Sequence, residues 1–183
     1  MKIILFNFLI LIFFISCANN QKNSSKNFPK ETNVSITDSL TGNRWSNIYF
    51  SGQPSEKDYQ KLREDKFSAV INLREKSEKS YSEKWEQGIA QKNGLAYYNH
   101  PFSMNKELTD DYITKVTKSI VKHRKEGKVL VHCSTGNKVG VWLGAHFKKD
   151  HKFSSEKSLE LAQELGLKKS IAIEKLKAYL SSK

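Results

Sequence analysis

The stretch VLVHCSTGNKVGVW, residues 129–142, constrains the fold of this chain more than any other segment. Its first part is apolar enough for a buried strand, and its last part continues with the spacing of a helix. Between them lies a short turn that contains Gly136. A strand followed at once by a helix is typical of α/β proteins, in which ligands bind beyond the carboxyl ends of parallel strands. Cys133 stands at such an end.

Strands and helices alternate along most of the chain, which predicts an α/β sandwich with a largely parallel sheet. Strands are expected where short apolar runs are bounded by turn residues, and helices where apolar residues recur every three or four positions. The expected strands are 47–52, 67–73, 96–102 and 128–133. Two helices are expected to start at Ser55 and Thr109. Four further helices are expected over 84–93, the segment after 140, 155–165 and 168–180.

The N-terminus has the features of an export signal. Lys2 precedes an apolar run over residues 3–15, which is short for a membrane span. The run stops at a small residue followed by Cys17, which resembles a bacterial lipoprotein lipobox in which that cysteine is acylated. Residues 1–16 are therefore expected to be removed, leaving a lipid-anchored protein of the bacterial cell envelope, on its periplasmic or outer surface. Ordinary secretion with an incidental cysteine is the alternative.

The remaining chain divides by composition. Residues 17–43 are polar and poor in large apolar groups, which predicts a flexible tether. Residues 44–183 are expected to form one catalytic domain, since a chain of 183 residues with 38% hydrophobic content suffices for one core. If Cys17 carries a lipid through its sulfur, the only other cysteine, Cys133, is a free thiol in an exported protein. A buried inert cysteine is the alternative.

The net charge of +12 does not predict a nucleic-acid partner. The lysines are spread along the chain among Glu and Asp, without a compact basic block interleaved with aromatic residues. They indicate a solvated surface with a mild bias toward anionic ligands. The five histidines are dispersed and predict no metal site.

The turn from Cys133 to Gly140 is suited to holding an anion. Backbone N–H groups in a tight turn at a helix N-terminus point into one concavity, and the helix dipole adds positive potential. Gly136 permits a backbone conformation that a side chain would obstruct. The same surroundings favour the thiolate form of a cysteine, so that nucleophile and anion cradle coincide. Such an arrangement suits covalent phosphoryl transfer through a phosphocysteine.

Three segments in consistent order resemble the cysteine-dependent protein tyrosine and dual-specificity phosphatases. The register is that of a bacterial branch related to the phosphatase-like part of beta-lactamase-hydrolase-like proteins, which has four residues between the cysteine and the arginine. The resemblance covers roughly residues 45–150. Its segments are HCSTGNKVGV at 132–141, YFSGQPSEKDYQKL at 49–62 and VINLREK at 70–76.

The resemblance implies a cysteine-phosphatase-like three-layer fold with a central, mainly parallel sheet of four to five strands flanked by helices. It implies a phosphorylated protein or small molecule as substrate, and no cofactor. Cys133 is then the nucleophile, and His132 orients the loop. The implied phosphate-binding positions are Ser134, Thr135, Gly136, Asn137, Val139 and Gly140.

The sequence departs from this family at the arginine, whose position falls on Lys138. Lysine keeps the positive charge but loses the planar fork that grips two phosphate oxygens. We therefore expect weakened catalysis, with anion binding better preserved than turnover.

The general acid of the superfamily, an Asp upstream of the cysteine, has no plain counterpart. Asp110 and Asp111 are candidates, but their place after Thr109 favours a role in the first turn of a helix. His100 is a second candidate. Arg74, at the end of a predicted strand, is expected either to reach the ligand or to leave the core into solvent.

Three functions are therefore open. The first is a phosphatase acting on a phosphomonoester such as phosphotyrosine. The second is a rhodanese-like sulfurtransferase, because those enzymes also present a cysteine in a short amide-lined loop. The third is a catalytically weak pseudophosphatase that binds anions.

Overall fold

The structure, a computed structural model, describes residues 30–79 and 81–183, which form an α/β fold around a six-stranded sheet. The strand order is β1-β2-β3-β6-β4-β5. Neighbours from β3 to β5 are parallel, whereas β1 and β2 extend the sheet in antiparallel fashion. The strands are β1 (Lys30–Ser35), β2 (Thr41–Trp45), β3 (Ile48–Ser51), β4 (Phe67–Asn72), β5 (Ala96–Asn99) and β6 (Lys128–His132).

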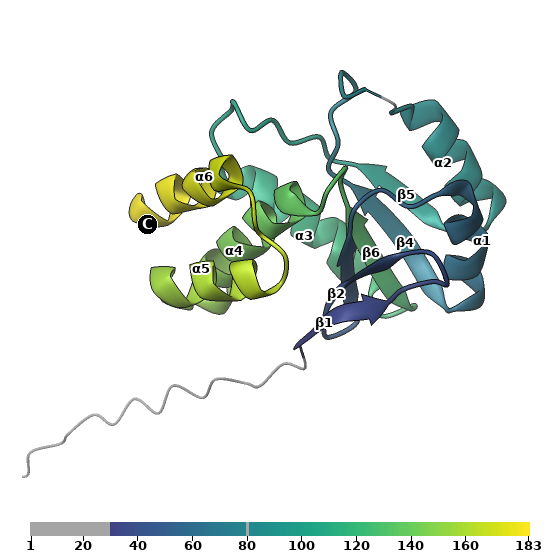
Figure 1. Ribbon diagram of the computed structural model, residues 1–183, viewed down its shortest axis with the longest axis horizontal. Coiled ribbons are helices and arrows are strands. Elements are labelled where there is room, and N and C mark those ends of the chain that lie inside the picture. Colours follow the sequence, from purple (N-terminus) through teal and green to yellow (C-terminus); the bar gives the residue numbers. More distant parts are fainter. Residues whose placement is uncertain (1–29, 80) are drawn as a thin grey trace, which may run out of the picture.

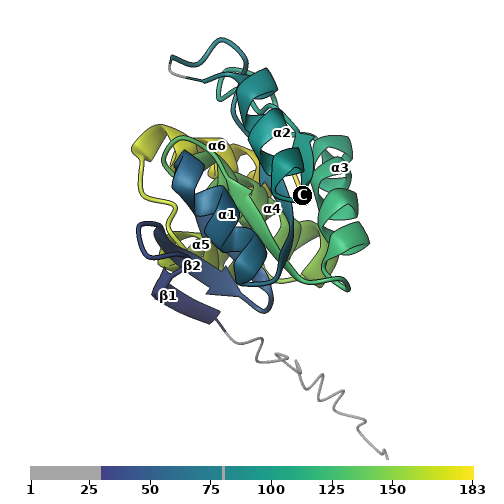
Figure 2. The same cartoon turned by 90° about the vertical axis from the view of Figure 1, so that its right-hand side faces the viewer.

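Helices cover both faces of the sheet, giving the three expected layers. Figure 1 shows α1 and α2 on one side and α3 to α6 on the other; the turned view of Figure 2 looks onto α1, with α4 to α6 behind the sheet. All the helices expected from the sequence are present. They are α1 (Glu56–Glu64), α2 (Glu83–Lys92), α3 (Asp110–His123), α4 (Asn137–His151), α5 (Ser155–Glu164) and α6 (Ser170–Ser181).

The alternation of side chains along the strands divides the core in two. In β6, Val129 and Val131 belong to the larger cluster under α3 to α6, whereas Leu130 belongs to the smaller cluster under α1 and α2. The same division separates Ile71 from Val70 in β4. Successive side chains of a strand point to opposite faces. The central strands are therefore buried on both sides, as their continuous apolar runs predict.

The predicted tether over residues 17–43 is wrong from Lys30 onward, because β1 and β2 belong to the sheet. The predicted count of four to five strands is too low for the same reason. Most of β1 is exposed, so this edge strand carries polar side chains and lacks the apolar alternation by which a strand is recognised. Residues 17–29, with Cys17 and the expected export signal, lie outside the described residues.

Asp58 anchors the turn between β1 and β2. Its carboxylate accepts hydrogen bonds from Thr37 Oγ1 and, at 2.7 Å, from Ser39 Oγ. It also accepts from the backbone N–H of Ser55 at 2.7 Å, at the start of α1. Burial raises the pKa of Asp58, but the hydrogen bonds from Ser55, Thr37 and Ser39 outweigh it and lower the pKa. Short polar side chains, typical of a linker, here form a specific contact with α1.

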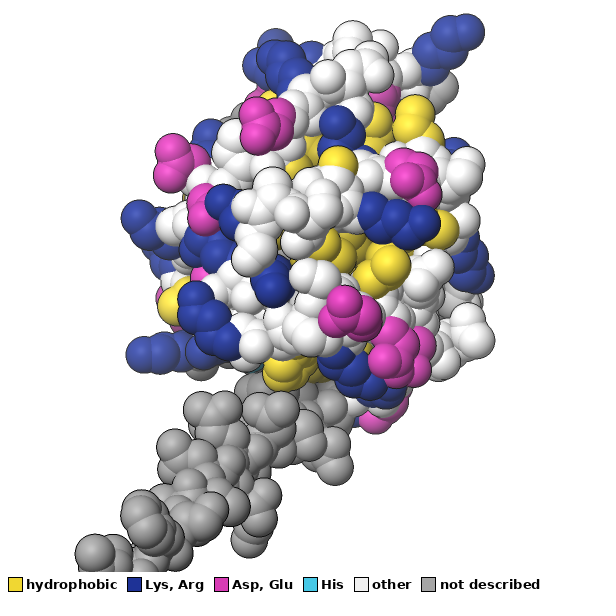
Figure 3. Space-filling model, turned by 90° about the vertical axis from the view of Figure 1, so that its left-hand side faces the viewer, with side chains coloured by type: hydrophobic (Ala, Val, Ile, Leu, Met, Phe, Trp, Pro, Cys, Tyr) yellow, Lys and Arg dark blue, Asp and Glu magenta, His cyan; other side chains and the backbone are white. Residues whose placement is uncertain are grey.

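The surface is mixed in charge. On the face drawn in Figure 3, Lys and Arg side chains are spread among Asp and Glu, with small apolar areas between them. Within the described part of the chain, none of the helices has the length and apolar character needed to cross a membrane.

Candidate active site

The strand, turn and helix predicted around Cys133 are confirmed. β6 ends at His132, and α4 begins at Asn137. Gly136, just before the helix, has φ 81° and ψ −17°. This left-handed conformation is unfavourable for residues with a Cβ atom, so the turn needs glycine at this position.

The segment after β3 runs beside this turn. Gly52 forms an isolated antiparallel bridge with Thr135, and the N–H of Gln53 lies 3.4 Å from the carbonyl oxygen of Ser134. A Cβ atom on Gly52 would be 3.1 Å from that oxygen. Two of the segments that carry the family resemblance, 49–62 and 132–141, therefore meet in space.

Cys133 and His132 lie on opposite sides of the sheet edge. Cys133 is a free cysteine, only 2% exposed, in the core cluster under α3 and α4. Burial raises the pKa of Tyr112 in α3, and the charge of the nearby Cys133 raises it further. The Tyr112 hydroxyl donates to the carbonyl oxygen of His100 at 2.9 Å. The thiol is thus near one neutral phenol and enclosed by apolar side chains.

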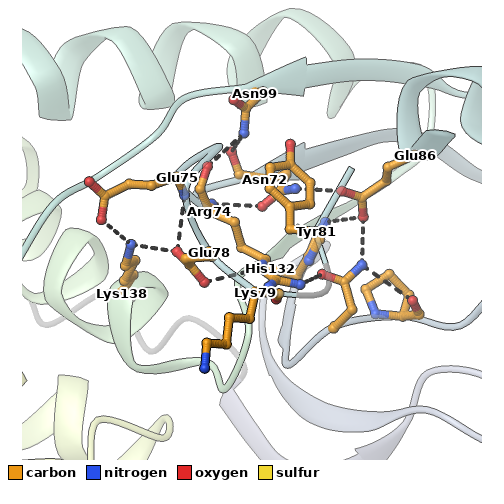
Figure 4. A network of polar contacts seen from close by, with 12 residues as sticks. Asn72, Arg74, Glu75, Glu78, Lys79, Tyr81, Glu86, Asn99, His132 and Lys138 are labelled. Atoms are coloured by element: carbon orange, nitrogen blue, oxygen red, sulfur yellow. Dashed lines mark hydrogen bonds and ion pairs between the residues drawn. The ribbon is translucent and has the colours of Figure 1, made fainter. Parts of the chain in front are cut away.

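His132 points instead toward α2, where it meets Glu86 (Figure 4). Its Nε2 atom lies 3.0 Å from Glu86 Oε1, and neither side chain is exposed to solvent. The Glu86 carboxylate also accepts hydrogen bonds from Gln53, Tyr59, Asn72 and Tyr97. One buried carboxylate thus connects α2 to α1, to three parallel strands and to the segment after β3.

These contacts keep the carboxyl group of Glu86 ionised. Burial raises the pKa of Glu86, but the interactions with His132, Tyr59 and Gln53 outweigh it and lower the pKa to about 2. Glu86 is not among the site residues predicted from the sequence. A signal was present, because Glu86 precedes Ile89 and Ala90 by three and four positions and so lies on the apolar face of α2.

Asn137 joins the loop to the C-terminal helices. Its Oδ1 atom accepts from the backbone N–H groups of Lys168 and Lys169, at 2.9 and 2.8 Å. Its Nδ2 atom lies 3.2 Å from Thr135 Oγ1. The predicted phosphate-binding role of Asn137 thus rests on its backbone N–H, since the side chain is used in the fold.

Lys138 is held by two carboxylates. Its Nζ atom lies 3.0 Å from Glu75 Oε2 and 2.7 Å from Glu78 Oε1, and the side chain is 13% exposed. Figure 4 shows both glutamates on the segment after β4, facing Lys138. Burial raises the pKa of Glu78, but hydrogen bonds from Lys138 and the Glu75 backbone outweigh it and lower the pKa. The cation expected to meet phosphate is therefore compensated within the protein.

Arg74 is buried, so the expectation that it leaves the core into solvent is wrong. Its guanidinium donates to Gln53 Oε1 at 2.8 Å, to Glu78 Oε2 at 3.0 Å and to the Lys79 carbonyl oxygen at 2.7 Å. It also lies over the ring of Tyr81. These contacts fix the segment after β4 against the segment after β3.

The remaining loop positions differ in exposure. Ser134 and Thr135 are exposed, whereas Val139 and Gly140 are buried. The N–H of Gly140 donates to the carbonyl oxygen of Gly136 at 3.0 Å, within the first turn of α4. This engages the Gly140 amide, so the predicted anion contact at Gly140 is not supported by a free N–H group.

The acid candidates lie at the start of α3. Thr109 caps this helix by accepting from the N–H of Tyr112 at 3.2 Å. Asp110 accepts from the hydroxyl of Tyr179 at 2.8 Å, and this bond, with Lys183, lowers its pKa. Asp111 is exposed. These positions agree with a first-turn role.

His100, the other proton-donor candidate, is buried. Its Nε2 atom lies 2.8 Å from Ser119 Oγ. Burial, with the nearby charge of Lys115, lowers the pKa of His100 to about 4. His100 is therefore neutral at physiological pH and does not carry a readily donated imidazolium proton.

No group of three or more His, Cys, Asp or Glu side chains suited to a metal ion occurs in residues 30–79 and 81–183.

Solved structures of proteins described as phosphatases are among those that resemble this chain in fold. The sequence matches no protein-family model and no curated protein. A complex of Pseudomonas aeruginosa TpbA, in a Cys-to-Ser variant, with pTyr has a TM-score of 0.64 at 17% identity, covering 86% of this chain and 90% of that one. A DUF442 protein of Shewanella putrefaciens CN-32 has a TM-score of 0.60 at 19% identity, over 78% and 87% of the two chains. The core catalytic domain of the Saccharomyces cerevisiae PP-IP phosphatase SIW14 has a TM-score of 0.56 at 18% identity, over 73% and 81%.

The chain has a protein-tyrosine-phosphatase-like fold. At these identities the similarity establishes the architecture, and the three-layer fold implied by the sequence is confirmed. Within the protein-tyrosine-phosphatase-like fold, Cys133 occupies a strand-to-helix turn at the carboxyl edge of the parallel strands, the edge at which such sheets bind ligands.

Proposed function

We propose that this chain is a cysteine-dependent phosphatase that hydrolyses a phosphomonoester. The observation that carries the proposal is the position of Cys133, directly after β6 and before a glycine-containing turn that opens the 15-residue helix α4. The free N–H groups of that helix end and its dipole favour a bound oxyanion beside the sulfur.

The proposed reaction has two steps. The Cys133 thiolate attacks phosphorus, the phosphorus–oxygen ester bond breaks, and the leaving oxygen takes a proton from an acid or from water. Water then attacks the phosphocysteine, releasing orthophosphate and restoring the thiolate. Loop N–H groups hold the non-bridging oxygens, where negative charge is concentrated in both transition states.

Hydrolysis of para-nitrophenyl phosphate by the full chain in detergent tests the proposal. Activity is expected in the wild type and absent in Cys133→Ser. It is expected to rise in Lys138→Arg, because a guanidinium grips two phosphate oxygens. Activity that persists in Cys133→Ser contradicts the proposal. Because TpbA was solved with pTyr, phosphotyrosine is the first physiological ligand to test.

Anion binding without turnover is a second candidate, favoured by the ion pairs that hold Lys138. It predicts that orthophosphate binds while no phosphocysteine is trapped on rapid acid quenching of the reaction. Rhodanese-like sulfur transfer is tested by thiosulfate:cyanide activity, which the phosphatase proposal predicts to be absent.

We also propose that the protein is attached to a membrane of the bacterial cell envelope through a lipid on Cys17. The support is the apolar run over residues 3–15 followed by a small residue and cysteine. Metabolic labelling with an alkynyl fatty acid is expected to mark the wild type and not Cys17→Ala.

A further inference from the structure

The described chain enters the domain at the edge of the sheet opposite to Cys133. Lys30, the first residue of β1, is paired with Trp45 at the end of β2, and Trp45 is paired with Ile48 at the start of β3. The parallel strands run from this edge to the one where Cys133 follows His132. In Figure 1 the start of β1 lies at the bottom of the molecule and the segment after β4 at the top. Strands of about five residues separate the two edges by about 17 Å.

The C-terminal ends of α3 and α4 lie at the same edge as the start of β1. The carbonyl oxygen of Arg124, directly after α3, accepts from Nδ2 of Asn47, in the turn between β2 and β3, at 2.7 Å. The rings of Trp45 and His151, the last residue of α4, lie 4.8 Å apart between centroids. The ends of both helices are therefore beside the point where the chain enters.

The helix ends carry exposed cations that take part in no ion pair of residues 30–79 and 81–183. Glu126, an acid in the turn after α3, lies 3.1 Å from Nδ1 of His123. We call this group of exposed cations the basic edge; it consists of Lys118, Lys122, Arg124, Lys125 and Lys152.

A groove between α3 and α4 passes through the basic edge. Its carboxylate Asp150 is engaged by His146 at 2.7 Å and by Lys149 at 2.9 Å. Val121 is 42% exposed. The groove thus presents ammonium and hydroxyl groups beside apolar surface, which suits the phosphate, glycerol and upper acyl parts of a phospholipid. Its lining residues are Thr114, Thr117, Lys118, Val121, Lys122, Lys149 and Asp150.

We propose that the basic edge docks on the anionic phospholipid headgroups of the membrane to which the chain is attached, with Cys133 facing away from the bilayer. The inference rests on the proposed attachment through Cys17. Residues 17–29 can span at most roughly 45 Å, which keeps the basic edge close to the membrane surface.

Docking in this orientation bears on the substrate. An anionic surface attracts nearby Lys and Arg side chains, and the attraction decays within the Debye length of about 8 Å at physiological salt. Cys133, about 17 Å from the basic edge along the strands, lies beyond this range. The docked domain therefore presents Cys133 to phosphomonoesters in the aqueous phase and not to headgroups of the same membrane.

Lysine acetylation of the full chain in lipid vesicles tests the inference. One set of vesicles is phosphatidylcholine alone and the other also contains phosphatidylglycerol, so that surface charge is what differs. Mass spectrometry gives the acetylation rate of each lysine. With phosphatidylglycerol we expect the rates at Lys122 and Lys152 to fall about fivefold, the equivalent of the attraction of a single lysine to such a surface. Lys57 and Lys84, exposed at the starts of α1 and α2, should react equally in both.

Salt and charge reversal identify the cause of the protection. Salt at about 1 M shortens the Debye length to about 3 Å and should remove the difference between the vesicles. Lys118→Glu/Lys125→Glu, at two exposed positions of the basic edge, should also abolish the protection of Lys122. The matched control Lys57→Glu/Lys84→Glu makes the same change of charge near the opposite edge of the sheet and should leave the protection intact.

The docking and the attachment fail in different ways. Equal rates in the two kinds of vesicle, or protection spread evenly over all lysines, would overturn the docking while the attachment stands. If the wild type does not sediment with phosphatidylcholine vesicles, the attachment is overturned. The docking then stands only if the protein still sediments with the phosphatidylglycerol vesicles with Lys122 and Lys152 protected.

Discussion

The Nε2 atom of His132 lies 3.0 Å from Oε1 of Glu86, although His132 ends a central strand and Glu86 lies on a helix of the outer layer. The contact fixes the residue before Cys133 on the sheet face opposite to the thiol. The backbone carbonyl of His132 is held separately, by the N–H of Leu73 at 2.9 Å. The start of the loop is thus fixed through both the side chain and the backbone of one residue.

Glu86 is expected to make stability depend on pH in acid. Its folded pKa of about 2 lies below the ordinary value of 4.5, so its contribution is fully present above pH 4.5 and is lost as pH falls toward 2. The contribution at neutral pH is on the order of 3 kcal/mol. Urea denaturation between pH 2.5 and 7 measures it. Glu86→Gln should flatten this dependence; an unchanged slope would contradict the assignment, and Glu83→Gln on the same helix is the control.

Asp58→Ala is expected to release the turn between β1 and β2, because it removes the acceptor shared by Thr37 and Ser39. We expect a loss of about 1–3 kcal/mol in the free energy of unfolding. Hydrogen exchange should quicken at Leu40, whose N–H donates to Thr37 Oγ1 at 3.0 Å. Asp38→Ala, at an exposed neighbour, is expected to have little effect on either measurement. Equal effects of the two substitutions would refute the anchoring role.

Two helical glycines should respond oppositely to alanine. A Cβ atom on Gly140 would lie 2.8 Å from Leu167 Cβ, whereas on Gly88 it would meet nothing within 4 Å. Gly140→Ala is expected to destabilise the protein by about 1–3 kcal/mol through overpacking. Gly88→Ala is expected to stabilise it by up to about 1 kcal/mol through helix propensity. Thermal unfolding of both variants tests these two expectations. A stabilising effect of Gly140→Ala would show that Leu167 moves to make room for the added methyl group.

Asn137→Ala is expected to leave the N–H groups of Lys168 and Lys169 without their acceptor. The cost is about 1–3 kcal/mol, with faster hydrogen exchange at these two amides. Asn137→Asp keeps the acceptor and should retain most of their protection. If the aspartate variant exchanges as fast as the alanine variant, the side chain does not hold the turn before α6.

The sequence predicts the central strands and all six helices because their signals are local: apolar runs, caps and helical spacing. Ser55 and Thr109, for example, are the predicted starts of α1 and α3. β1 escapes prediction because an exposed edge strand is stabilised by pairing with β2 and not by its own apolar pattern.

The candidate site is predictable in its backbone and less so in its side-chain contacts. Cys133 and Gly136 follow from the strand-to-helix turn. The partners of Lys138 do not, because Glu75 and Glu78 are about 60 residues away in sequence, and which carboxylates meet a lysine depends on how strands align. Glu86 could have been noticed as a charge on an apolar helix face, but its five contacts come from five different segments.

The hydrogen bonds between Asn137 and the turn before α6 make the loop after Cys133 depend on residues that lie C-terminal to α4 and α5. The segments that carry the family resemblance end at residue 141. Asn137, at the end of the turn after Cys133, nevertheless accepts from the N–H groups of Lys168 and Lys169, and Gly140 in the first turn of α4 faces Leu167. A fragment cut after α4 would keep every residue of the motif without the support that shapes it. A shorter chain with the same motif would need other donors for the hydrogen bonds that Asn137 accepts here.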